Sequence, residues 1–123
     1  MMTTKIAIEE VGLNTEKYFL FYEELDWSMQ FRNAGYEIWY EPTAYVYHKE
    51  GASIKPGSPL RRYYHMRSRI LFVKRNSNGL TKLVSLTYLC TISLLKETLI
   101  NLLKGNVKTI SAIWKGCLEG FKA

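Results

Sequence analysis

The apolar positions of the first third of the chain change their spacing several times, which predicts short elements of mixed type. Residues 4–11 have helical spacing and predict a short helix that ends at Gly12. A second apolar stripe of helical spacing predicts a helix over roughly residues 24–34. Between them, residues 18–22 form a continuous aromatic run, typical of a strand or a tight loop buried on several sides.

Two short stretches after this helix have the composition of β-strands. Residues 37–41 and 43–48 are rich in aromatic and β-branched residues and are separated by Pro42. Residues 49–59 then contain two Gly, two Pro and two Ser, which predicts a loop. We therefore expect two short strands followed by a long connection.

Helical spacing resumes in the second half and predicts helices over 60–75, 80–103 and 107–121. The uninterrupted apolar part of the middle helix, residues 83–95, would be about 20 Å long, whereas a bilayer core is roughly 30 Å thick. These lengths favour a helix that does not cross a membrane, with a membrane span as the alternative. One apolar stripe of the last helix contains Ile110, Ile113, Trp114, Cys117 and Phe121.

Composition adds limits to this picture. The chain has 123 residues, 47% of them hydrophobic and 14% aromatic, which suits one modest domain and argues against disorder. Residues 1–10 lack the pattern of a signal peptide. Cys90 and Cys117 lie 27 residues apart without metal-site spacing, so we expect a reducing, cytoplasmic setting instead of a disulfide scaffold or zinc module.

The net charge of +6 is unevenly divided. Residues 1–60 carry five basic and nine acidic side chains, and residues 61–123 carry twelve basic and two acidic ones. The acidic half suits metal binding or acid–base chemistry, whereas the basic half suits phosphate or anionic lipid. The chain has no recognisable motif for reading nucleic acid, and we expect no nucleic-acid partner.

The densest chemical feature is an acidic cluster of Glu23, Glu24 and Asp26. Three close carboxylates repel one another and need a cation, a shared proton or full solvation. The alternative is an ordinary acidic helix N-terminus, which the helix dipole favours. His48 lies 22–25 residues later and is either an ordinary half-buried histidine or a metal ligand. Imidazole with carboxylates suits Mn²⁺ or a similar divalent ion.

A longer pattern adds a family resemblance. The segment Glu9–Ser53, EEVGLNTEKYFLFYEELDWSMQFRNAGYEIWYEPTAYVYHKEGAS, resembles the C-terminal half of the catalytic domain of family 2 glycosyltransferases, closest to the rhamnosyltransferase-like, polysaccharide-biosynthesis branch. The later YYHMRSRILFVKRN resembles the next family segment, and the last forty residues resemble its amphipathic tail. The resemblance implies an α+β fold: the C-terminal portion of a GT-A α/β fold, with a short helix and two or three short strands, followed by a mainly α-helical tail. Residues 1–59 would be the acceptor-side part of the catalytic domain, and residues 60–123 the basic amphipathic tail.

The resemblance also implies an enzyme activity. Such enzymes transfer a sugar from a nucleotide-sugar donor to a hydroxyl of a lipid-linked or saccharide acceptor in cell-surface polysaccharide synthesis, with inversion at the anomeric carbon. Glu24 matches the general base of the family, Glu23 would orient the acceptor or the base, and Asp26 matches the next acid of the motif.

Further residues match the binding positions of the family. His48 matches the histidine that completes the site of a divalent metal, Mn²⁺ or Mg²⁺, in the complete enzyme. Residues 49–59 match a flexible loop that closes over the diphosphate, and within this scheme Ser53 and Arg67 are assigned to cofactor binding.

The chain also departs from the family pattern. Gln30 occupies the position of a usual arginine, and Arg32 cannot replace it because two residues correspond to about 200° of rotation on a helix. Arg67-Ser68 stands where Arg-Asn is usual. The sequence contains no Asp-x-Asp motif and no nucleotide-binding half, so we expect this chain alone to be incomplete and inactive in sugar transfer.

Partners and location follow from these expectations. An exposed sheet edge and apolar face would promote self-association into homo-oligomers. The basic, apolar tail suits peripheral contact with the inner face of the cell membrane, or alternatively a helical bundle that packs on its own domain or on another copy. The alternative function is a non-enzymatic helical module that binds a membrane or a partner.

Overall fold

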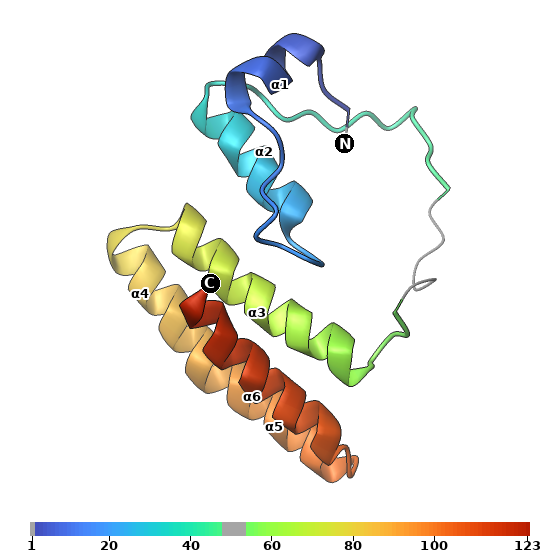
Figure 1. Cartoon of the computed structure of the whole chain (residues 1–123), viewed down its shortest axis with the longest axis vertical. Coiled ribbons are helices and arrows are strands. Elements are labelled where there is room, and N and C mark those ends of the chain that lie inside the picture. Colours follow the sequence, from blue (N-terminus) through green and yellow to red (C-terminus); the bar gives the residue numbers. More distant parts are fainter. Residues whose placement is uncertain (1, 48–53) are drawn as a thin grey trace.

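The computed structural model describes residues 2–47 and 54–123, and within this part of the chain every regular element is a helix (Figure 1). The helices expected from the apolar spacing are confirmed, with small shifts at their ends. In chain order the elements are α1 (Lys5–Val11), α2 (Glu23–Asn33), α3 (Pro59–Asn76), α4 (Gly79–Tyr88), the π-helix η1 (Leu89–Ser93), α5 (Leu94–Leu103) and α6 (Val107–Lys122).

Local sequence explains where the first and the third helix begin. The Thr4 hydroxyl accepts a hydrogen bond from the Ala7 backbone N–H at 3.3 Å, which caps α1. At the start of α3 the Ser58 hydroxyl accepts one from the Arg61 N–H at 3.3 Å, and proline occupies the first helical position. Both starts therefore follow from side chains within four residues of the helix end.

The second half of the chain forms a unit of three helices that pack against one another. The α4–η1–α5 segment is one continuous helix that runs antiparallel to α3, whereas α6 runs parallel to α3 (Figure 1). Cys117 and Ile113 of α6 pack against α3 and the long helix. The buried cluster consists of Met66, Ile70, Leu89, Leu94, Ile113 and Cys117.

Two glycines allow α6 to approach α3 closely. A Cβ atom on Gly116 would clash with the carbonyl oxygen of Tyr63, and one on Gly120 would lie 2.9 Å from the Cβ of Ile70. Only glycine leaves room for the backbone of α3 at these two positions. The stripe expected on α6 is only partly buried: Ile113 and Cys117 lie in the core, whereas Trp114 and Phe121 are 44% and 45% exposed. Thr109 and the two glycines are buried as well.

The first part of the chain forms a smaller unit beside α3. Helix α2 lies alongside α3, and α1 packs on the side of α2 that faces away from α3 (Figure 1). The Trp27 indole N–H donates to the carbonyl of Gly12 at 3.0 Å, and the ring of Trp27 packs against Phe31 with centroids 5.1 Å apart. Phe31 is 2% exposed and forms the small core of this unit.

The expected α+β fold is wrong for the described part of the chain. Residues 37–47 form no strand, and no sheet exists within residues 2–47 and 54–123. A strand is stable only where a neighbour pairs its N–H and C=O groups, and no described segment pairs with residues 37–47 in this way. The large hydrophobic side chains of this segment are exposed, from 50% for Ile38 to 101% for Tyr47. The described chain is therefore helical, without the GT-A strands or the expected sheet edge.

Candidate functional site

The acidic cluster occupies the first turn of α2, directly after two residues with unusual backbone conformations. Phe21 and Tyr22 have φ angles of 66° and 69°, in the left-handed region that ordinary L-residues disfavour by about 1–2 kcal/mol each. Tyr22 is the N-cap of α2 and makes no side-chain capping bond. Strained backbone of this kind persists only where surrounding contacts impose it, and it concentrates at functional sites.

Contacts from α3 impose this conformation on the aromatic run. The Ser68 hydroxyl, which is fully buried, donates to the Leu20 carbonyl at 2.8 Å. The Arg67 guanidinium donates to the Lys17 carbonyl at 3.0 Å. The run expected as strand or tight loop is thus a tight loop held against α3. Arg67, predicted to bind the cofactor, lies at this junction with its Nη1 bonded to backbone.

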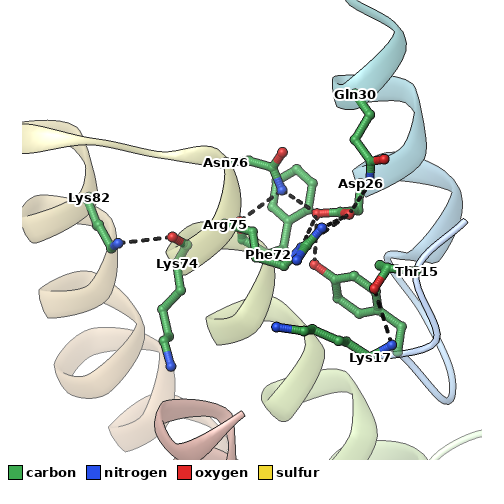
Figure 2. Close-up of polar contacts among 10 residues, drawn as sticks. Thr15, Lys17, Asp26, Gln30, Phe72, Lys74, Arg75, Asn76 and Lys82 are labelled. Carbon is green, nitrogen blue, oxygen red and sulfur yellow. Dashed lines mark hydrogen bonds and ion pairs between the residues drawn. The ribbon is translucent and has the colours of Figure 1, made fainter. Parts of the chain in front are cut away.

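Asp26 is the centre of a buried polar network that joins α2 to the end of α3 (Figure 2). Its side chain is 1% exposed. Arg75 reaches both carboxylate oxygens, with Nε 3.1 Å from Oδ1 and Nη2 3.1 Å from Oδ2. The Asn76 amide donates to Oδ1 at 2.6 Å, the Gln30 amide to Oδ2 at 2.9 Å and the Tyr18 hydroxyl to Oδ1 at 3.1 Å.

Burial and the hydrogen bonds of this network determine the protonation states of Asp26 and Tyr18. Burial alone would raise the pKa of Asp26, but the hydrogen bonds from Arg75, Asn76, Gln30 and Tyr18 outweigh burial and hold that pKa below its ordinary value. Burial, followed by the neighbouring carboxylate, raises the pKa of Tyr18 well above its ordinary value. Asp26 is thus a carboxylate and Tyr18 a neutral phenol at pH 7. With both oxygens already accepting hydrogen bonds, Asp26 is a poor proton acceptor and a strong anchor for α2.

The two glutamates of the acidic cluster differ in their exposure to solvent. Glu24 is exposed on the first turn of α2, and its backbone carbonyl accepts a hydrogen bond from the Ser28 hydroxyl at 2.7 Å. Glu23 is half-buried, and its Oε2 atom is buried without a hydrogen-bond partner among the described residues. Of the three predicted catalytic acids, Glu24 is the one that a solvent-borne hydroxyl reaches most readily.

An apolar groove begins beside this turn. It has a volume of about 410 Å³ and lies between α3 and α4. Tyr22 lines it together with Phe72, Tyr88 and Arg69. Because Tyr22 is two residues before Glu24, the groove opens next to the acidic turn, and Arg69 gives it one positive charge.

The described residues do not fit a metal site. In residues 2–47 and 54–123 no group of three or more His, Cys, Asp or Glu side chains could hold an ion. His48, the predicted metal ligand, and Ser53, predicted for cofactor binding, lie outside the described residues. The Mn²⁺ or Mg²⁺ expected for the complete enzyme therefore stays a prediction.

Sequence reasoning missed the partners of Asp26. The Gln30 amide donates to Asp26 from the next turn of α2, and Arg75 supplies a guanidinium from α3. The only available signal was the Arg75-Asn76 pair that ends the segment YYHMRSRILFVKRN. Nothing in that segment pointed to an acid 49 residues earlier.

Comparison of the chain with protein-family models, with curated proteins and with solved structures gave no match.

Proposed function

We propose that this chain is the acceptor-side segment of an inverting glycosyltransferase, which transfers a sugar from a nucleotide-sugar to a hydroxyl acceptor in cell-surface polysaccharide synthesis. The observation that carries the proposal is the exposed Glu24 carboxylate on a helical turn that the buried Asp26–Arg75 pair holds in place. The proposal concerns the reaction and not a GT-A architecture. The donor-binding part would come from another segment or another chain.

In the proposed reaction Glu24 is the catalytic residue. Its carboxylate accepts the proton of the acceptor hydroxyl while the hydroxyl oxygen bonds to the anomeric carbon. The bond from that carbon to the diphosphate oxygen breaks, and the nucleoside diphosphate leaves with the electron pair. Attack from the face opposite the leaving group inverts the anomeric centre.

Asp26 and Arg75 are positioning residues in this scheme. Their pair fixes the first turn of α2 relative to α3, and the groove lined by Tyr22 and Phe72 would receive an apolar or lipid-linked part of the acceptor. Fixing a base within reach of its substrate is a large part of what an enzyme contributes. Glu23, with its partly buried carboxylate, would orient the acceptor or the base.

The test is a sugar-transfer assay on the protein as isolated from its source cells, with a panel of labelled nucleotide-sugars. Glu24→Gln removes the base but keeps the shape of the side chain, and kcat should fall by about 10²–10⁴-fold with little change in donor KM. Glu16→Gln, which alters an exposed glutamate in the preceding loop, is the matched control and should leave kcat unchanged. Equal loss in both variants, or full activity of Glu24→Gln, would overturn the assignment.

A further inference from the structure

The outer side of the α4–η1–α5 helix carries a continuous apolar face. Its residues recur every three or four positions along the helix, so they lie in one stripe. Each is largely exposed, for example Leu95 at 61% and Leu99 at 57%. The apolar face consists of Val84, Tyr88, Ile92, Leu95, Leu99 and Leu102. At its α4 end, Val84 and Tyr88 also line the edge of the groove between α3 and α4.

No described part of the chain covers this face. The opposite side of the same helix is used for the core, where Leu89 and Leu94 are 4% and 3% exposed. Helices α3 and α6 pack on that inner side (Figure 1). An exposed stripe of this length on one helix is larger than the scattered apolar residues normal for a surface, and it marks a binding face.

The charges around the apolar face are almost all positive. Lys96 is exposed beside the stripe, and Lys104 and Lys108 are exposed just beyond the end of α5. Glu97 is the single acidic residue of the 79–103 segment, and Arg62 neutralises it through an ion pair of 3.1 Å. A partner of negative charge fits this surface, whereas a second copy would bring like charges together.

The geometry also indicates how the helix would meet a lipid bilayer. The segment Gly79–Leu103 has 25 residues and a mean hydropathy of 1.4 in its best window, so its length and composition would allow it to cross a membrane. Its inner side, however, is bound to α3, which carries Arg61, Arg62, Arg67 and Arg69. Crossing would place these charges in hydrocarbon or break the core, whereas lying flat buries only the apolar face.

We infer that the apolar face of α4–η1–α5 docks on an anionic lipid surface, with the helix parallel to the membrane plane and the lysines among the lipid headgroups. The inference stands apart from the proposed sugar transfer. It would hold equally for an enzyme and for a non-enzymatic module.

The test is co-sedimentation of the full chain with vesicles, without nucleotide-sugar. Binding should be strong to vesicles of phosphatidylcholine with 30% phosphatidylglycerol, weak to phosphatidylcholine alone, and reduced by raising NaCl from 0.1 to 0.5 M. The triple variant Ile92→Gln, Leu95→Gln, Leu99→Gln should lose binding about tenfold or more. The matched control Ile6→Gln, Leu13→Gln, Leu25→Gln changes three exposed residues of the first unit, 55–80% exposed, and should bind like wild type.

A second measurement keeps the test informative if the triple variant misfolds. Trp114 is 44% exposed and donates to the Thr98 hydroxyl of α5 at 3.1 Å, so it lies near the apolar face. Brominated lipids should quench the fluorescence of the wild-type chain, and Trp114→Phe should remove most of that quenching. Absence of quenching on bound vesicles would overturn the docking orientation.

Two other uses of the apolar face, contact with a second copy and a membrane span, would each give a different experimental result. A wild-type dimer that the triple variant converts to a monomer, with no vesicle binding, would overturn the inference in favour of a second copy. Resistance of membrane-bound protein to extraction at alkaline pH would overturn the flat orientation in favour of a span. Extraction at alkaline pH supports surface docking. Failure of the Glu24→Gln assay would leave all these results unaffected.

Discussion

Arg75 and Asp26 lie 49 residues apart in the chain and form a bidentate ion pair, with two N···O distances of 3.1 Å. The carboxylate is 1% exposed and the arginine side chain 30%. The pair joins α2 directly to the end of α3, and the Asn76 amide donates to the same carboxylate. Together with the bonds from Ser68 and Arg67 to the loop before α2, it links the small N-terminal unit to the helical unit that follows.

We expect Asp26→Asn to lower the free energy of unfolding by about 2–3 kcal/mol. Removing one member of a buried pair costs about 3–5 kcal/mol, and the partial exposure of Arg75 reduces that figure. Urea denaturation followed by circular dichroism measures the change. The control is Glu9→Gln, which breaks the exposed Lys5–Glu9 pair and should cost at most about 0.5 kcal/mol. Similar losses in the two variants would contradict the assigned role of Asp26.

We expect the free energy of unfolding to decrease as the pH is lowered through the range in which His65 titrates. Burial, and then the charges of Arg69 and Arg62, lower the pKa of His65 below its ordinary value. The unfolded chain, with a histidine pKa of about 6.5, therefore binds the proton first as pH falls. The folded state loses stability below about pH 6.5, and His65→Gln should flatten the pH dependence of Tm between pH 7 and 5. An imidazole that titrates above 6.5 by NMR in the folded chain would refute the prediction.

We expect Gly116→Ala to destabilise the protein by about 1–3 kcal/mol, although alanine is the better helix former by about 1 kcal/mol. The added Cβ would clash with the Tyr63 carbonyl and force α6 away from α3. Thermal unfolding measures the effect. Ser111→Ala, at an exposed position of the same helix, is the control and should leave Tm unchanged or raise it slightly.

We expect the two cysteines to differ in reactivity. Burial, followed by the neighbouring Cys90, raises the pKa of the Cys117 thiol to about 11, and the two sulfur atoms are 4.0 Å apart. Little Cys117 thiolate exists at pH 8, so its alkylation by iodoacetamide should be about a hundredfold slower than that of an ordinary cysteine. Peptide mass spectrometry should find Cys90 modified first. In concentrated urea the two rates should become similar.

The helices were predictable because their determinants are local. Apolar residues recur at helical spacing in 60–75, 80–103 and 107–121, and caps such as Thr4 and Ser58 act within four residues. The prediction of strands was wrong, because 37–47 has the composition of strands but no segment among the described residues pairs with it. The composition of a segment indicates whether that segment suits a strand, but a sheet also requires a second segment that pairs with it.

The sequence by itself determined the helical segments, the division of charge and the acidic turn at 23–26. Tertiary structure alone decided that Asp26 is a buried anchor while Glu24 is exposed, because that difference depends on Arg75 and Asn76 at the far end of α3. It also decided which side of the 79–103 helix is core and which is the exposed apolar face. Both sides are rich in leucine, and only the packing of α3 and α6 distinguishes them.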